Sequence, residues 1–343
     1  MRTALIVGLA GETLTRDERA FLRDCRPAGV ILFARNCAAA DQIARLVSDA
    51  RTAAGAAADD FLVLIDQEGG RVRRLRPPLW RALPSAAAYA AMQADDPLKA
   101  RRAAWLSARL TARDLSALGI NTNCAPVLDL RVRGAHEIIG DRAYGETSAE
   151  VARLARAVAE GYIAGGVVPV VKHIPGHGRA MADSHFELPA VDTPRAELEA
   201  TDFAPFRALR DMPAAMTAHV VYSAIDATGP ASTSAIVTAE IIRGYIGFDR
   251  LLMSDDLGMK ALTGSFRERA AAVSAAGSAV ALHGSGNLEE MHAAASGVPR
   301  LTGRSRSRLE ACIAITRREA AFDVAEAEAA LAEAVEADAM RVA

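Results

Sequence analysis

Short apolar runs recur along the chain, and the segments between them carry apolar residues at helical spacing. The apolar runs lie at residues 5–9, 29–33, 61–65, 124–130, 167–171, 214–220, 251–254 and 279–282. The segments with helical spacing include residues 16–25, 41–54, 98–118, 149–161, 195–210 and 239–246. Buried parallel strands are apolar on both faces and alternate with helices that cover the sheet. Eight such units predict an α/β fold with a closed (β/α)8 TIM-type barrel, and an open doubly wound sheet is the alternative.

The chain has no Pro-, Gly- or Ser-rich linker and no change of composition that would divide it. We therefore expect a single catalytic domain over residues 1–343, with the barrel at about 1–300. The remainder, about 301–343, is rich in Ala, Glu and Arg and predicts C-terminal helices packed on the barrel. Hydrophobic residues make up 51% of the 343 residues, enough to bury a large core.

Charge and composition narrow the class of ligand. Forty Lys and Arg against 42 Asp and Glu give a net charge of −2, so there is no broad basic field for nucleic acid or an anionic membrane. Aromatic residues are scarce, at 5%, and do not interleave with basic ones as in base-stacking surfaces. The expected partner is a small molecule, with no nucleic acid and no membrane, and the expected state is a monomer or weak dimer.

Two further features suggest the compartment. The four cysteines are dispersed, without metal-site spacing, as is typical of a reducing cytosol. The apolar start of the chain is cut short by Glu12, Arg16 and Asp17 and indicates a first strand rather than a signal peptide. No uninterrupted run of about 18 apolar residues is present, so no membrane span is expected. The protein is expected to be cytoplasmic.

Polar residues close five consecutive apolar runs. They are Asp66 to Arg71, Asp129, Lys172 with His173, His219, and Asp255 with Asp256. Barrel active sites lie at the carboxyl ends of the strands, so these groups converge on one mouth. Some of them could instead cap the helices that follow, but five together favour a site.

The segment 172–185 is the densest in candidate chemistry. Asp183 and His185 stand two residues apart on a loop, so the carboxylate could orient the imidazole and raise its basicity. The alternative is an Asp-capped turn beside a surface histidine. Of the adjacent pair at the seventh run, only one side chain can face the mouth. Asp256 leads into residues 257–262 and is the better helix cap, which leaves Asp255 as nucleophile or electrostatic stabiliser.

Asp66 and Arg142 complete the candidate set. A carboxylate at a strand end beside two glycines can accept hydrogen bonds from vicinal hydroxyls, and Arg142 supplies a forked donor. The alternative for Arg142 is an internal ion pair with Asp141 or Glu146. Aspartates, a Lys-His pair and an arginine, without a phosphate loop or a metal cluster, favour a neutral polyhydroxylated ligand such as a sugar. No cofactor and no metal are expected.

At these residues the chain resembles glycoside hydrolase family 3, and within it the bacterial single-domain β-N-acetylglucosaminidases of cell-wall recycling. Three separated motifs, in order, carry the resemblance. They are Asp66-Gln67-Glu68-Gly69-Gly70-Arg71-Val72, Lys172-His173-Ile174-Pro175-Gly176-His177-Gly178 with Asp183-Ser184-His185, and Ser254-Asp255-Asp256-Leu257-Gly258-Met259.

The resemblance implies retaining hydrolysis through a covalent glycosyl-enzyme. It assigns Asp255 as the nucleophile, His185 as the general acid/base and Asp183 as the group that orients His185. It further implies that Asp66, Arg142, Lys172 and His173 bind the N-acetylglucosamine. The expected substrate is N-acetylglucosaminyl-1,6-anhydro-N-acetylmuramic acid, a muropeptide of peptidoglycan recycling.

One segment departs from the family pattern and leaves alternatives open. An Ala-Gly-Cys/Ala-Asp run and a Cys-Asn pair are expected near the eighth strand, where this chain has Ala276-Gly277-Ser278-Ala279 and His283-Gly284-Ser285-Gly286-Asn287. This departure leaves two interpretations open, altered specificity and weak activity, while the catalytic positions match the family. The alternatives are a β-glucosidase, an N-acetylglucosaminide phosphorylase, a Schiff-base aldolase acting through Lys172, and an inactive barrel that binds an amino sugar.

Overall fold

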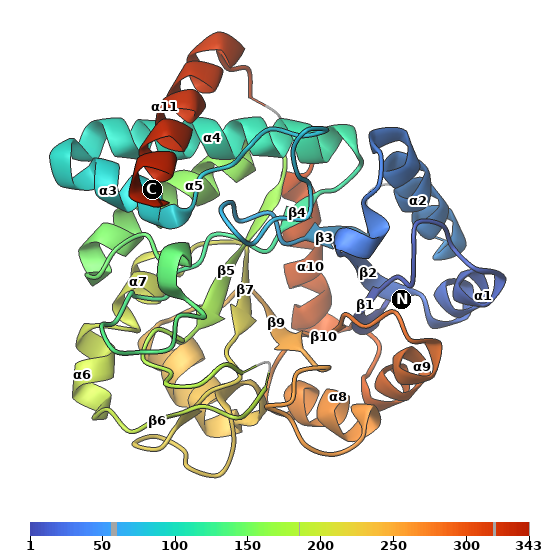
Figure 1. Ribbon diagram of the computed structural model, residues 1–343. Helices are drawn as coiled ribbons and strands as arrows, with labels where there is room; N and C mark the ends of the chain where they lie inside the picture. Colours follow the sequence, from blue (N-terminus) through green and yellow to red (C-terminus); the bar gives the residue numbers. More distant parts are fainter. Residues whose placement is uncertain (56–59, 185, 318–319, 343) are drawn as a thin grey trace.

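Eight parallel strands close into a barrel in the computed structural model, which describes residues 1–55, 60–184, 186–317 and 320–342 (Figure 1). Around the barrel the strand order is β1, β10, β9, β7, β5, β4, β3, β2. Their bounds are β1 Thr3–Gly8, β2 Pro27–Leu32, β3 Leu62–Ile65, β4 Thr122–Asn123, β5 Val168–Ile174, β7 Ala214–Thr217, β9 Leu251–Asp256 and β10 Val280–His283. The first strand pairs with both the second and the last, which confirms the closed (β/α)8 barrel and excludes the open sheet.

Helices surround the barrel on its outside. They are α1 Arg16–Cys25, η1 Ala34–Asn36, α2 Ala40–Ala53, α3 Ala86–Asp95, α4 Pro97–Ala117, η2 Gly140–Arg142, α5 Ser148–Ala164, α6 Arg195–Ala200, α7 Ala204–Ala208, η3 Ala231–Thr233, η4 Val237–Tyr245, α8 Phe266–Ala275, α9 Leu288–Gly297, α10 Gly303–Ile315 and α11 Val324–Val342. A separate two-stranded sheet pairs β6 (Ala190–Val191) with β8 (Val221–Tyr222). Among the described residues no helix combines the length and the apolar character that crossing a bilayer requires.

Several helices begin at a capping box that the sequence encodes locally. At α1 the Thr15 side chain accepts from the Glu18 amide, while the Glu18 carboxylate accepts from the Thr15 amide. The same reciprocal pair begins α5 and α8. Each box satisfies two amides that the helix itself leaves without partners, so the strand-to-helix turns are fixed in place.

Two predicted elements differ from the structure for reasons of hydrogen bonding. The run 124–130 was expected as a strand, but the strand β4 covers only Thr122–Asn123. Pro126 has no N–H, so the chain continues as an irregular segment that still bonds to β5, as from the Val170 amide to the Ala125 carbonyl at 3.1 Å. The predicted helix 195–210 divides into α6 and α7, because Pro205 cannot donate to the preceding turn.

The amino-terminal end of the barrel is covered, which leaves the carboxyl ends of the strands for a site. Leu309, Cys312 and Ile313 of α10 pack into the same buried cluster as the inward-facing strand residues. The Cys312 thiol lies 3.2 Å from the carbonyl of Pro213, immediately before β7. The last helix, α11, lies on α3 and α4 (Figure 1), where Leu331 joins a smaller buried cluster with Leu106 of α4.

Candidate active site

A cavity of about 270 Å³ opens at the carboxyl ends of the strands. Its lining includes the predicted residues Asp66, Arg142, Lys172, His173 and Asp255. The cavity is small beside ligand sites of ~300–1,000 Å³, and polar groups from β3, β5 and β9 converge on it. The sequence-based prediction that strand ends meet at one mouth is confirmed for Asp66, Lys172, His173 and Asp255. Arg142 comes from η2, and the other two predicted strand-end groups, Asp129 and His219, are not among the lining residues.

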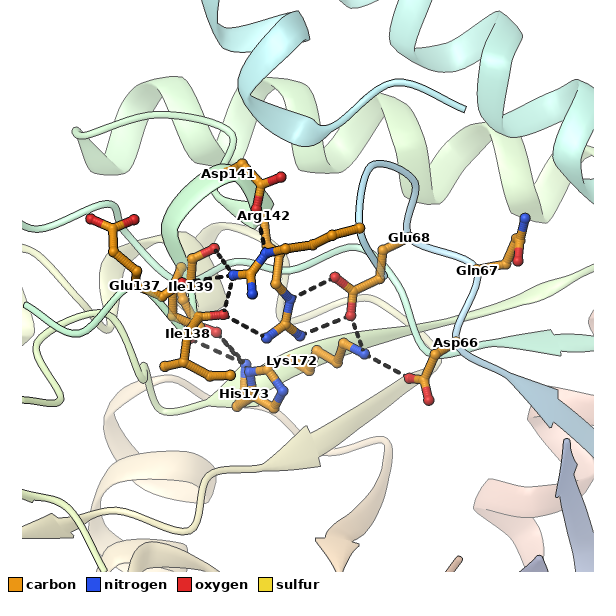
Figure 2. A network of polar contacts seen from close by, with 12 residues as sticks. Asp66, Gln67, Glu68, Glu137, Ile138, Ile139, Asp141, Arg142, Lys172 and His173 are labelled. Carbon is orange, nitrogen blue, oxygen red and sulfur yellow. Dashed lines mark hydrogen bonds and ion pairs between the residues drawn. The ribbon is translucent and has the colours of Figure 1, made fainter. Parts of the chain in front are cut away.

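Charged side chains form a continuous network along one wall of the cavity (Figure 2). The Lys172 ammonium lies 2.9 Å from Asp66 Oδ1 and 2.6 Å from Glu68 Oε1. Glu68 accepts two parallel hydrogen bonds from Arg142, each 2.8 Å long. Asp66 is also paired with Arg74, at 2.9 Å. Both ends of each carboxylate are therefore held, which fixes the polar wall before any ligand binds.

In this network, burial and the neighbouring charges shift the pKa values of the side chains in opposite directions, and the effect of the charges is the larger. Burial alone would raise the pKa of Glu68, but Arg142 and Lys172 lower it to about 2. Burial would lower the pKa of Lys172, yet Asp66 and Glu68 raise it above its ordinary value. Because a Schiff-base lysine must lose its proton, this environment disfavours the aldolase alternative.

Arg142 does form an internal ion pair, but with a partner that was not predicted. The alternatives were Asp141 and Glu146; the structure pairs Asp141 with Arg71 and Glu146 with Arg133. Arg142 pairs with Glu68, as Figure 2 shows. Glu68 stands two residues after Asp66, which was the available signal, since alternate residues leaving a strand point to the same side.

Asp255 lies at the end of β9 and lines the cavity. Its Oδ1 accepts a hydrogen bond of 2.8 Å from the amide of Asp256. Burial would raise the pKa of Asp255, but His173, His219 and this amide together lower it below the ordinary value. The carboxylate is therefore ionised at neutral pH, as a nucleophile must be.

Asp256 has a structural role, but it does not cap a helix as the sequence predicted. Residues 257–262 form a turn rather than a helix. Asp256 Oδ1 accepts from the amides of Gly258 at 2.8 Å and of Gly284 at 3.0 Å, so it closes that turn and ties the end of β9 to the end of β10. The expectation of a helix cap is wrong, because, among the residues described, no helix follows β9 directly.

His173 is oriented by a buried carboxylate that the sequence placed among the converging polar groups without assigning it a role. Asp129, which is fully buried, lies 2.7 Å from His173 Nδ1 and accepts from the His177 amide at 2.7 Å. Burial would raise the pKa of Asp129, but His173 and His177 lower it. Asp129 is thus the positioning residue for two histidines, and its place at the end of the apolar run 124–130 was the signal.

The loop after β5 brings Asp183 to the same side of the barrel. Asp183 is half-buried, and its carbonyl accepts from the amides of Phe186 and Glu187. The next residue, Ser184, lines the cavity and its hydroxyl lies 3.0 Å from His177 Nε2. His185, the predicted general acid/base, lies outside the described residues.

Gly178 lies against Leu130, the residue next to Asp129, and so affects the position of the contact between Asp129 and His173. A Cβ at this position would lie 2.3 Å from the Leu130 carbonyl oxygen, and backbone cannot give way as a flexible side chain can. We expect Gly178→Ala to displace residues 129–130 and to lower kcat/KM by roughly tenfold to a hundredfold. Gly11→Ala is the matched control, because its Cβ would meet no atom within 4 Å. Equal kcat/KM values for the two variants would contradict this reading.

Among the described residues, no group of three or more His, Cys, Asp or Glu side chains is arranged to hold a metal ion. The cysteines Cys25, Cys37, Cys124 and Cys312 are all free thiols.

Comparison with known proteins agrees with this geometry. Residues 5–310 match the family described as glycosyl hydrolase family 3 N-terminal domain. A β-hexosaminidase of Alkalilimnicola ehrlichii is 42% identical over 277 residues, covering 80% of this chain and 78% of the relative. A second, from Methylococcus capsulatus, is 42% identical over 276 residues, covering 78% and 79%.

Solved structures give the same result over nearly the whole chain. NagZ from Neisseria gonorrhoeae, solved in complex with N-trifluoroacetyl-D-glucosamine, superposes with a TM-score of 0.86 at 31% identity and covers 98% of both chains. A family 3 β-N-acetylglucosaminidase from Paenibacillus sp. superposes with a TM-score of 0.85 at 30% identity, covering 98% of this chain and 67% of the other. The chain therefore belongs to glycoside hydrolase family 3 and is a hydrolase of the β-hexosaminidase type.

Proposed function

We propose that the protein is a retaining exo-β-N-acetylglucosaminidase. Asp255 attacks the anomeric carbon of a terminal N-acetylglucosamine, and the leaving oxygen takes a proton from His185. Water then hydrolyses the glycosyl-enzyme, with His185 as the base and Asp183 orienting it. The observation that carries this proposal is the ionised Asp255 carboxylate in a cavity built from strand ends.

A histidine acid/base suits a site already dense in carboxylates. Imidazolium becomes neutral when it gives up its proton, whereas a carboxylic acid would add a second negative charge near Asp255. A neutral imidazole also repels an anionic acceptor less than a carboxylate would. The experiment below must therefore distinguish phosphorolysis from hydrolysis.

Asp66, Lys172, Arg142 and His173 are proposed to bind the N-acetylglucosamine. Asp66 and Lys172 offer an acceptor and a donor on the cavity wall. Because the ion network already fixes these side chains, little conformational entropy is lost in ordering them when the sugar binds. The acetamido group would be held by the protein, since Asp255 is available as the nucleophile. The relatives named β-hexosaminidase and the NagZ complex with an N-acylated glucosamine support an N-acetyl sugar as ligand.

The finer proposal is that this enzyme acts in the cytoplasm on muropeptides. There it would cleave N-acetylglucosaminyl-1,6-anhydro-N-acetylmuramic acid in peptidoglycan recycling. It rests on the resemblance to the cell-wall recycling enzymes and on the small cavity, which fits removal of one terminal sugar.

A substrate panel tests the function. We expect release of p-nitrophenol from the N-acetyl-β-glucosaminide and none from the β-glucoside. We also expect the anhydromuropeptide disaccharide to be cleaved with a higher kcat/KM than chitobiose. Each reaction is run with and without phosphate, and the sugar product is analysed. Formation of a sugar 1-phosphate would show that the enzyme is a phosphorylase and not a hydrolase. Preference for the glucoside would overturn the proposed N-acetyl specificity. Binding of the sugar without turnover would support the inactive barrel.

A further inference from the structure

A buried histidine stands behind the nucleophile, in the segment that departs from the family pattern. His283 closes β10 and is completely buried. It does not line the cavity, so it does not reach the substrate. Its ring packs against Phe266 with centroids 4.6 Å apart. The neighbouring strand is β9, which ends in Asp255 and Asp256.

The hydrogen bonds around Nε2 fix where the proton of the neutral ring lies. Nε2 is 2.9 Å from the Ser285 hydroxyl and 3.1 Å from Glu290 Oε2. Ser285 has one hydroxyl proton, which it donates to Glu290 over 2.5 Å, and its oxygen accepts from the Asn287 amide. No proton remains for Ser285 to give to His283. Nε2 therefore carries the ring proton and donates it.

Nδ1 is therefore unprotonated, and its lone pair faces a carboxylate. Within the part of the chain that the structure describes, this buried nitrogen has no hydrogen-bond partner. It faces Asp256 Oδ1 at 3.9 Å. A second proton taken up here would convert two facing acceptors into a hydrogen-bonded ion pair, with the imidazolium between Asp256 and Glu290.

Three charged groups, each from a different element, affect the pKa of His283. Burial lowers the pKa of His283 below its ordinary value, Asp256 of β9 and Glu290 of α9 oppose that shift, and Arg269 of α8 adds to it. The net shift is downward, so the ring is neutral until the solution is more acidic than an ordinary histidine requires, and the two carboxylates limit that shift.

Asp256 connects His283 to the nucleophile. The amide of Asp256 donates to Asp255 Oδ1 at 2.8 Å, and its carbonyl lies 3.1 Å from His219 Nε2. The Asp256 carboxylate bonds at the same time to the amide of Gly284, next to His283. A change of charge or position at Asp256 therefore affects Asp255 directly, through the hydrogen bond between the Asp256 amide and Asp255 Oδ1.

We propose that His283 is a proton-dependent positioning residue for the nucleophile strand. In acid solution it takes a proton from solvent onto Nδ1 and forms an N–H···O hydrogen bond to Asp256 Oδ1. The cation balances the charge of Asp256, so Asp255 stays ionised to lower pH than it otherwise would. The effect on turnover rests on the proposed role of Asp255; the protonation itself does not.

Two variants separate the nitrogens. His283→Gln retains a nitrogen near the Nε2 position and removes Nδ1, whereas His283→Asn retains a donor near Nδ1 and removes Nε2. In the pH profile of kcat/KM on the aryl N-acetylglucosaminide, we expect the acid limb of His283→Gln to move up by roughly half a pH unit. His283→Asn should move it less. His292→Gln, at an exposed histidine of α9, is the control and should leave the limb in place.

A second measurement separates this proposal from the proposed function. Exchange of the histidine C2 hydrogen for deuterium, followed by mass spectrometry of the full chain, gives the titration midpoint of each histidine. We expect the His283 midpoint to fall in Glu290→Gln and in Asp256→Asn, because each variant removes a facing negative charge. A midpoint unchanged in both variants overturns the proposal. A midpoint that falls, with an acid limb that does not move in His283→Gln, overturns the link to Asp255 alone.

Discussion

Replacing Asp255 by alanine is expected to lower kcat on an aryl N-acetyl-β-glucosaminide by roughly 10⁴-fold or more. The variant has no carboxylate at position 255 to attack the anomeric carbon, and the carboxylate of the neighbouring Asp256 is held by the amides of Gly258 and Gly284. KM should change much less, because the network of Asp66, Lys172, Glu68 and Arg142 that forms the sugar-binding wall does not bond to Asp255. Initial-rate kinetics on the purified variant measure both.

Chemical rescue distinguishes loss of the nucleophile from general damage. Azide is small enough to enter the space that the carboxylate vacates, so it should restore turnover of Asp255→Ala and produce the α-glycosyl azide. Asp66→Ala should not be rescued, since it removes a binding group instead. Equal rescue of both variants, or a β-glycosyl azide, would contradict the assignment of Asp255.

Replacing Glu68 by glutamine is expected to destabilise the protein by roughly 3–5 kcal/mol at pH 7. The substitution removes the charge that balances Arg142, whose side chain is only 9% exposed, and one of the two carboxylates on Lys172. A buried cation without its partner costs far more than a surface pair contributes. Urea unfolding at pH 7 measures the loss, with exposed Glu12→Gln as the control.

The pH dependence of this difference has a definite sign. The pKa of Glu68 is about 2 in the folded protein against an ordinary 4.5, so folding favours the ionised form. The stabilisation is present in full above about pH 4.5 and is lost as the pH falls toward 2. The unfolding free energies of the wild type and Glu68→Gln should therefore converge in that range. A constant difference from pH 7 to pH 3 would show that Glu68 acts by packing alone.

The barrel could be predicted from the sequence because its signal is local and repeated. Each barrel strand except β4 lies in a short apolar run, and the segments that become α1, α2, α4 and α5 carry helical spacing. Two of the errors in element boundaries fall at Pro126 and Pro205, where a missing N–H outweighs the apolar pattern.

The candidate site was predictable only in part, for a different reason. Asp66, Lys172, His173 and Asp255 stand at strand ends, and the barrel topology alone brings such residues together. The partners Glu68 for Arg142 and Asp129 for His173 depend on distances across the cavity, which spacing along the chain does not encode. His283 was visible only as a departure from the family pattern, because its partners Glu290 and Asp256 come from different elements.

The proposed mechanism requires Asp255 to become covalently glycosylated during turnover. The most direct measurement is to incubate the enzyme with a slowly hydrolysed 5-fluoro-N-acetylglucosaminyl fluoride, digest it, and locate the added sugar mass by peptide sequencing in the mass spectrometer. We expect one fluorinated N-acetylhexosamine, on Asp255 and nowhere else, and its disappearance as activity returns. A label on another residue, or full turnover of the reagent with no labelled peptide at any time, would contradict it.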